Sequence, residues 1–209
     1  SPSACLVAGL LGANTLLGCP LSDEDLSDLA AELEGHPDNT APALLGGLVT
    51  AVMEGGRVYT VSVPVSENIR FAVFIPDFEL KTEVARAALP EQVSRADAVY
   101  NLSRAALMTA SLCKGDFSHL RVAVQDRLHQ PYRFPMIPGA EQVFYIAYGL
   151  GAHAVAISGA GPSILAVIDS ADTAFADKAA LRLREAGLTG WQVQLFGCDS
   201  RGATVEFVG

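Results

Sequence analysis

The sequence predicts an α+β fold in two domains, residues 1–67 and residues 68–209. Half of the 209 residues are hydrophobic, which is enough for one good core or two small ones. Apolar helical patterns and β-branched runs both occur, and a short polar linker at residues 66–68 precedes a new strand. We therefore expect the second domain to open at about residue 68.

The composition argues against two broad classes of function. A net charge of −9 and a pI near 4.8 argue against a nucleic-acid surface, because phosphate backbones require clustered Lys and Arg. No apolar run reaches the roughly 18 to 20 residues that span a bilayer, and no charged leader precedes the first segment. The four cysteines lack the spacing of a zinc site or a disulfide framework. We expect a cytoplasmic protein that binds neither nucleic acid nor membrane.

The first elements are two helices and a hairpin. Residues 4–17 are small or apolar almost all round, which predicts a buried helix. Ser1 or Ser3 would stand at its N-terminus, where free N–H groups favour phosphate, although a plain N-cap is the alternative. Ser22 and the acidic residues after it predict the start of the second helix. The inner stripe of that helix would comprise Leu26, Leu29, Ala30 and Leu33. Two β-branched runs around Gly55-Gly56 then predict a hairpin.

The turn that ends the second helix concentrates polar residues. Glu32 and Glu34 lie at the helix C-terminus, against the helix dipole, where a bound Mg²⁺ would compensate them. Solvated surface glutamates are the alternative. His36, Asp38 and Asn39 converge on the following turn and predict a polar site, unless Asp38 or Asn39 merely caps the next helix.

The second domain begins with a strand at residues 71–77. Thr82 and Arg86 follow four residues apart, on the same side of a helical turn. Arg133, between two prolines, is predicted to lie in a loop, where it either decorates the surface or joins Arg86 in clamping a carboxylate. A long helix at about residues 94–113 is expected between them, followed by another from Phe117. The inward residues of the long helix would be Val99, Leu102, Ala106 and Leu107.

A glycine-rich turn at residues 158–163 separates two β-branched runs. A tight hairpin that needs glycine at positive φ is one interpretation, and a nest of N–H groups for an anion is the other. The nest would comprise Ser158, Gly159, Ala160, Gly161 and Ser163. A helix near residues 172–186 and a pair of strands, residues 191–196 and 203–208, complete the prediction.

Five stretches, in this order, resemble the homoserine kinases of the GHMP small-molecule kinase family over essentially the whole chain. The first is the most specific, because its H-x-D-N-x-A-P form differs from the S-G-x-D form of other branches. The stretches are E-L-E-G-H-P-D-N-T-A-P-A-L-L-G-G, L-K-T-E-V-A-R, N-L-S-R-A-A-L, H-Q-P-Y-R and I-S-G-A-G-P-S.

The resemblance implies an S5-like nucleotide-binding domain followed by a ferredoxin-like α/β sandwich. It also implies that Ser1-Pro2-Ser3-Ala4 is the tail of a phosphate loop whose glycines and preceding strands are missing here. Together with the apolar pattern that follows and the absence of an initial methionine, this predicts a fragment or a processed chain.

The resemblance further implies the roles of individual residues in a transfer of phosphate from ATP to L-homoserine. Glu32 matches the glutamate that binds Mg²⁺, with Glu34 as the alternative, and Asn39 would orient the acceptor hydroxyl. His36 and Asp38 would line the acceptor site. Further substrate contacts would come from Thr82, Arg86 and Arg133, and phosphate contacts from Ser1, Ser3 and residues 158–163. A homodimer is possible.

Two other interpretations remain open at this stage. The chain is then either a GHMP kinase with a different alcohol as acceptor, or a catalytically incomplete piece that acts only as a folded module.

Overall fold

The computed structural model describes residues 2–206, which form two compact units. Residues 2–65 and 198–206 make up the first, and residues 66–197 the second. The return of residues 198–206 to the first unit differs from the predicted division, which gave them to the second domain. The N–H of Gly47 and that of Ala203 explain this return, because they donate to the carbonyls of Asp199 and Leu44 at 2.7 and 3.2 Å.

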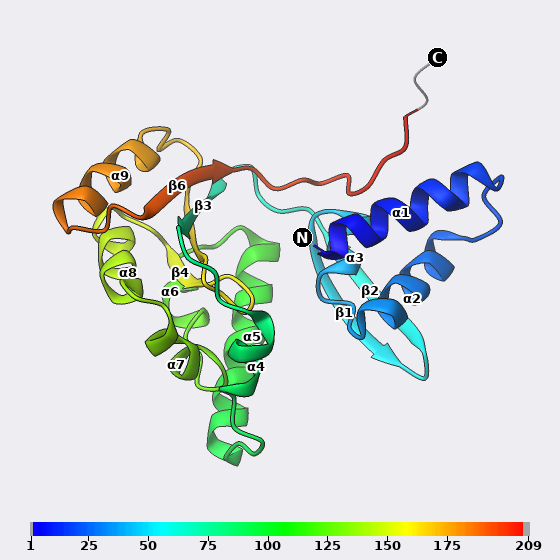
Figure 1. The fold of residues 1–209 in the computed structure, drawn as a ribbon, viewed down its shortest axis with the longest axis horizontal. Coiled ribbons are helices and arrows are strands. Elements are labelled where there is room, and N and C mark those ends of the chain that lie inside the picture. Colours follow the sequence, from blue (N-terminus) through cyan, green and yellow to red (C-terminus); the bar gives the residue numbers. More distant parts are fainter. Residues whose placement is uncertain (1, 207–209) are drawn as a thin grey trace. The chain divides into compact units, whose positions relative to one another are not determined.

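The described residues of the first unit form three helices and a hairpin (Figure 1). Its elements are α1 (Pro2–Leu16), α2 (Asp23–Glu34), α3 (Thr40–Leu45), β1 (Leu48–Glu54) and β2 (Arg57–Val63). Ser22 and Asp25 form the capping box that begins α2, and the hairpin pairs Glu54 with Arg57 across Gly55 and Gly56. Both glycines have positive φ, 60° and 80°, as a two-residue hairpin turn requires.

The prediction of a buried first helix is wrong for the described chain. Only one side of α1 packs, with Val7 against Leu26, Ala30 and Leu44, so that Leu16 remains 85% exposed. The inner stripe of α2 is also shifted: Ser27 and Ala31 are buried, whereas Leu33 is exposed. The sequence shows which residues are apolar, but the packing of α1, α2 and α3 on one another decides which are covered.

The second unit is a four-stranded antiparallel sheet with helices. Its strands are β3 (Ile69–Pro76), β4 (Ala154–Ile157), β5 (Ile164–Asp169) and β6 (Trp191–Phe196), in the spatial order β4-β5-β3-β6. Its helices are α4 (Thr82–Ala87), α5 (Arg95–Lys114), α6 (Leu120–Ala123), α7 (Gln130–Arg133), the 3₁₀ turn η1 (Phe134–Met136), α8 (Ala140–Gly149) and α9 (Phe175–Glu185). This order and the β-α-β-β-α-β sequence of elements confirm the predicted ferredoxin-like arrangement.

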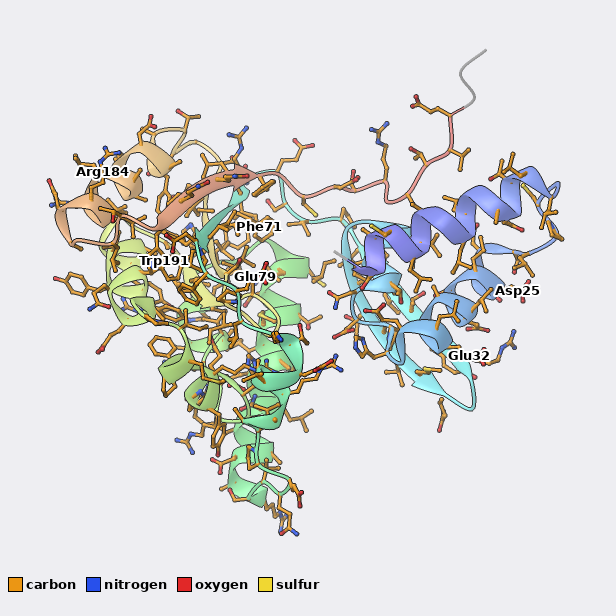
Figure 2. All side chains as sticks on the ribbon, in the orientation of Figure 1. Asp25, Glu32, Phe71, Glu79, Arg184 and Trp191 are labelled. Carbon is orange, nitrogen blue, oxygen red and sulfur yellow. The ribbon has the colours of Figure 1, made fainter. Side chains whose placement is uncertain are left out.

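The core of the second unit lies between one face of the sheet and the helices α8 and α9. Phe74 of β3 meets Phe175 of α9 edge to face, with ring centroids 6.4 Å apart. Trp191, labelled in Figure 2 at the start of β6, is 8% exposed and closes one end of the same core. The alternating burial of β3 follows the period of two that the sequence predicts for a strand with one face in the core.

Three predictions for the second unit are wrong. The stripe of α5 expected to face inward is turned outward, with Val99 58% and Leu102 73% exposed. The opposite side of α5 faces the rest of the unit, because Asn101 on that side donates a hydrogen bond to Asp126 and accepts one from the N–H of Arg127. The helix from Phe117 is only the single turn α6, and β6 pairs with β3, while residues 203–206 form no strand. Residues 207–208 of the expected last strand lie outside the described residues.

Candidate active site

The polar turn after α2 is built by a left-handed glycine. Gly35, at φ 89°, ends α2 and turns the chain toward α3. Beyond it the imidazole Nδ1 of His36 lies against the carboxylate of Asp38. Asn39 occupies the N-cap position of α3, but its exposed side chain makes no capping hydrogen bond. Among the described hydrogen bonds, none uses the side-chain amide of Asn39.

A hydrogen bond joins the start of α1 to the end of α2. The hydroxyl of Ser3 donates to a carboxylate oxygen of Glu34 at 2.9 Å, and Ser3 is only 2% exposed. Glu32, two residues earlier and therefore on the other side of α2, is exposed (Figure 2). Ser1 lies outside the described residues. Of the two glutamates, Glu34 is thus the one beside the predicted phosphate-binding helix start.

The oxygen atoms of Ser3 and Glu34 suit a hard cation such as Mg²⁺, which takes few protein ligands and completes its shell with substrate phosphates and water. Within residues 2–206 there is no group of three or more His, Cys, Asp or Glu side chains that would hold a metal ion without such help. A site of this kind therefore depends on phosphate oxygens.

In the second unit, α4 and the glycine-rich turn line one cavity. Its volume is about 330 Å³, and Lys81, Thr82 and Ser163 are among its lining residues. Arg86 lies on the same helix as Thr82 and is exposed. Two stretches that are about 80 residues apart in the sequence are thus neighbours in the fold.

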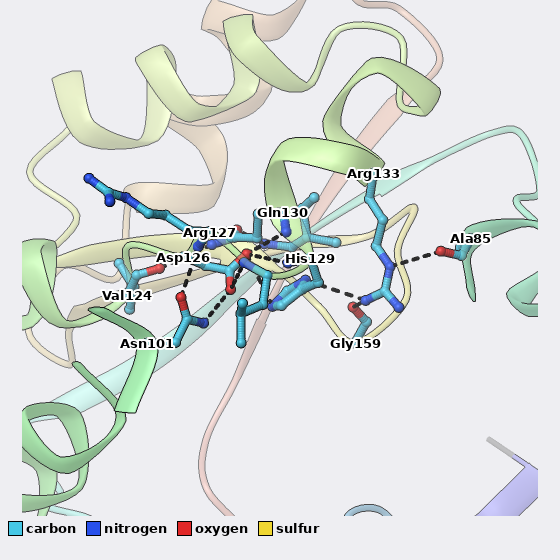
Figure 3. A network of polar contacts seen from close by, with 11 residues as sticks. Ala85, Asn101, Val124, Asp126, Arg127, His129, Gln130, Arg133 and Gly159 are labelled. Carbon is cyan, nitrogen blue, oxygen red and sulfur yellow. Dashed lines mark hydrogen bonds and ion pairs between the residues drawn. The ribbon is translucent and has the colours of Figure 1, made fainter. Parts of the chain in front are cut away.

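Arg133 ties these two stretches together and is not a loop residue. It ends the short helix α7, where Pro131 fits because the first helical N–H groups need no intrahelical partner, and it is 9% exposed. Its Nε donates to the carbonyl of Ala85 at 3.2 Å and its Nη1 to that of Gly159 at 3.0 Å (Figure 3). Burial lowers the pKa of Arg133, Arg86 lowers it further, and Asp126 opposes both. Arg86 and Arg133 therefore act on each other electrostatically.

The glycine-rich turn is a hairpin between β4 and β5, as one of the two interpretations had it. The N–H of Ser158 donates to Ser163 and that of Gly161 to Ser158, at 2.8 and 3.0 Å. Gly159 and Gly161 both have positive φ, and a Cβ on Gly161 would meet Ile137 at 2.9 Å. Among the described hydrogen bonds, none uses the N–H of Gly159 or Ala160. The turn is closed by its own backbone and still offers two adjacent N–H groups.

A buried polar network behind Arg133 was not predicted. Asp126 accepts hydrogen bonds from Asn101 and from the N–H groups of Leu128, His129 and Gln130. Gln130 in turn accepts from the N–H of Ile157 at 2.9 Å, immediately before the glycine-rich turn. The sequence did contain a signal for this network: Asp126 stands a few residues before Pro131, as a capping residue does before the start of a helix. The prediction of one continuous helix from Phe117 hid this signal.

Comparisons with known proteins identify the family of the chain. Residues 1–47 match the GHMP kinases N terminal domain and residues 108–187 match GHMP kinases C terminal. The chain is 47% identical over 205 residues to the homoserine kinase of Clostridium beijerinckii, covering 98% of this chain and 68% of that protein. The chain belongs to the homoserine kinase family of GHMP kinases.

Two further members of the family place the chain in the same way. It is 44% identical to the homoserine kinase of Caldicellulosiruptor saccharolyticus, covering 98% of this chain and 67% of that protein. The crystal structure of homoserine kinase from Cytophaga hutchinsonii is 32% identical, with a TM-score of 0.83 over 94% of this chain and 64% of that one. The chain thus spans about two thirds of the length of these family members. No helix in the described part of the chain combines the length and apolarity needed to cross a membrane.

Proposed function

We propose that the protein transfers the γ-phosphoryl group of MgATP to the side-chain hydroxyl of L-homoserine, giving O-phospho-L-homoserine for threonine biosynthesis. Membership of the homoserine kinase family supports the reaction. The structural observation that carries it is the 2.9 Å hydrogen bond between Ser3 and Glu34, which joins a helix start suited to phosphate with a carboxylate suited to Mg²⁺.

Glu34, in place of Glu32, is the residue that would hold Mg²⁺. The metal supplies charge neutralisation for the phosphates when it is bound. Glu34 is half-buried and already oriented by Ser3, whereas Glu32 extends into solvent. Ser1, Ser3 and the turn of residues 158–163 are the proposed phosphate contacts, the latter through the N–H groups of Gly159 and Ala160 and the hydroxyls of Ser158 and Ser163.

The proposed acceptor contacts come from each unit separately. In the first unit they are His36 and Asp38, which would bind polar groups of the acceptor. In the second unit Thr82 would contribute a hydroxyl, and Arg86 would bind the carboxylate. Arg133 adds only its remaining Nη2, because its Nε and Nη1 already donate to Ala85 and Gly159, so a two-nitrogen clamp by Arg133 alone is not available.

Catalysis of phosphoryl transfer depends mainly on positioning and charge neutralisation, so a strong protein base is not required. Asn39 carries a neutral amide that cannot accept a proton at pH 7. Its role in this mechanism is to orient the acceptor hydroxyl, and the proton leaves to phosphate or solvent. We also propose that the protein is cytoplasmic and that, besides its small-molecule substrates, it binds a second copy of itself to form a homodimer.

The proposal is tested with protein expressed from its full reading frame. ATP turnover is coupled to NADH oxidation, and each acceptor is supplied in turn: L-homoserine, L-serine, L-threonine and mevalonate. We expect turnover that requires L-homoserine and Mg²⁺ and a product whose mass is that of O-phosphohomoserine. Equal turnover with mevalonate would assign another GHMP acceptor, and a folded protein without turnover on any acceptor would overturn the proposal.

A further inference from the structure

A buried carboxylate, that of Asp126, caps the N-terminus of the short helix α7. The side chain of Asp126 is 6% exposed, and it accepts the N–H of Leu128 at 3.0 Å and that of His129 at 2.8 Å (Figure 3). A third backbone N–H, from Gln130, and the amide of Asn101 complete its contacts. These donors are the otherwise unpaired groups of a helix N-terminus, so Asp126 fixes where the first turn of α7 stands.

His129 lies between this carboxylate and Arg133. Its Nε2 is 3.9 Å from an oxygen of Asp126, and its Nδ1 is 3.3 Å from Nη1 of Arg133. A guanidinium nitrogen only donates, so Nδ1 of His129 must be the acceptor and the ring proton must sit on Nε2, toward Asp126. Burial lowers the pKa of His129 and Arg133 lowers it further, while Asp126 opposes them. The imidazole is thus neutral near pH 7 and able to accept.

Arg133 has little freedom once these contacts are made. Nε bonds the carbonyl of Ala85 in α4, and Nη1 bonds both the carbonyl of Gly159 and the imidazole of His129. With only the carbonyls of Ala85 and Gly159 as partners, the guanidinium plane could still rotate about the line between these two oxygen atoms. The hydrogen bond to His129 prevents this rotation. The orientation of the third nitrogen, Nη2, is therefore set by His129.

We propose that His129 is a positioning residue for the phosphorylation of homoserine: by accepting from Arg133 at Nδ1 it fixes the guanidinium that faces the carboxylate of the acceptor. The proposal rests on the proposed function for its kinetic consequence. It also makes acceptor affinity depend on pH, since protonation of His129 would place a second cation against Arg133. The charged groups that surround His129 are Asp126 and Arg133 from its own segment, Arg104 of α5 in the cavity that His129 lines, and Arg86 of α4 beyond Arg133.

The test compares two substitutions that differ in one acceptor atom. His129→Asn keeps an acceptor oxygen near the position of Nδ1, whereas His129→Leu has similar bulk and no acceptor. We expect His129→Leu to raise the KM for L-homoserine about tenfold or more, as loss of a hydrogen bond to a charged group does, with kcat and the KM for ATP changed less than about twofold. His129→Asn should restore the KM for L-homoserine to within about threefold of the wild-type value.

A pH profile separates positioning from a merely structural role. In the wild-type protein kcat/KM for L-homoserine should fall at acid pH, below the ordinary histidine value of about 6.5, because the pKa of His129 is lowered. In His129→Asn this decrease should disappear because the amide does not titrate. Any of three results would overturn the proposal. The KM for L-homoserine could be unchanged in His129→Leu, or it could be raised equally in both variants. The decrease of kcat/KM at acid pH could also be the same in His129→Asn as in the wild-type protein. Circular dichroism and thermal unfolding establish that the variants are folded.

A spectroscopic measurement tests the hydrogen bond between His129 and Arg133 independently of whether homoserine is the acceptor. In ¹⁵N-labelled protein, the Nδ1 of His129 should show the chemical shift of an unprotonated nitrogen at pH 7.5, and Arg133→Lys should alter that shift. A ring protonated at Nδ1 would overturn the inference whatever the assay gives. Absence of turnover with the expected Nδ1 shift would instead reject the proposed function and leave the contact between His129 and Arg133 established.

Discussion

The hydroxyl of Ser3 donates a hydrogen bond of 2.9 Å to the carboxylate of Glu34. This contact favours Glu34 as the metal ligand, whereas the sequence resemblance puts Glu32 first and Glu34 second. We expect Glu34→Gln to weaken the apparent Mg²⁺ affinity at least tenfold, because one of the few protein ligands is lost. Glu32→Gln should remain within about threefold of wild type. The measurement is kcat/KM for ATP over a range of Mg²⁺ concentrations, and the reverse order of effects would restore Glu32 as the ligand.

Asn39 can be changed without disturbing the fold. Its side chain is exposed and makes no cap to α3, so Asn39→Ala should alter the free energy of unfolding by less than about 0.5 kcal/mol. A loss of hydroxyl orientation should lower kcat by up to about 100-fold. Steady-state kinetics with L-homoserine provide the test, with Asn68→Ala, an exposed asparagine outside the site, as the control. Full kcat with only KM raised would make Asn39 a binding residue and nothing more.

Arg86 is predicted to bind the carboxylate of the acceptor. We expect Arg86→Ala to raise the KM for L-homoserine about 10- to 100-fold, since a hydrogen bond to a charged group contributes about 1.5–3 kcal/mol. L-homoserine amide, which lacks the carboxylate, should be used equally poorly by the wild-type protein and the variant. Arg184→Ala, at an exposed site in the last turn of α9, is the matched control. A KM for L-homoserine that Arg86→Ala leaves unchanged would remove Arg86 from the acceptor site.

Asp126 should make the stability of the protein depend on pH in the acid range. Burial by itself raises the pKa of Asp126, but hydrogen bonds from Asn101 and three backbone N–H groups together lower it below its ordinary value. A lowered pKa in the folded state contributes stability that is fully present above the unfolded value, about 3.9, and is lost as the pH falls through the folded value.

The variant Asp126→Asn tests this dependence. It should cost about 1–3 kcal/mol in the free energy of unfolding at pH 7, because an amide cannot accept so many N–H groups. The difference from wild type should shrink as the pH is lowered below about 4. Urea unfolding at pH 7, 5 and 3.5 measures both effects, and Glu91→Gln, at an exposed carboxylate before α5, is the control. A constant difference at all three values would contradict the assignment.

Local signals in the sequence were sufficient for most element boundaries. Ser22 and Asp25 start α2, Gly35 ends it in the left-handed conformation, and Gly55 with Gly56 makes the hairpin turn. Each of these depends on groups within a few residues of one another, so the sequence alone specifies them. The stretches that resemble homoserine kinase were recognisable for the same reason, since they are contiguous.

The sequence failed where burial depends on a neighbour from elsewhere in the chain. The apolar stripe of α5 was visible, but its orientation follows from Asn101, which is 25 residues away from its partner Asp126. Arg133 appeared to be a loop residue between two prolines, yet it is buried by contacts to Ala85 and Gly159, which are 48 and 26 residues away. Periodicity carries no information about such partners.

The sequence by itself determined the family and much of the order of helices and strands, and it supplied the polar residues from which we propose that a kinase site is made. Only the tertiary structure decided which of those residues are paired: Glu34 and not Glu32 with Ser3, and His129 and Asp126 behind Arg133. The physical reason is that helix capping and turn geometry are local, whereas the desolvation and hydrogen bonding of a charged side chain depend on elements that only folding brings together.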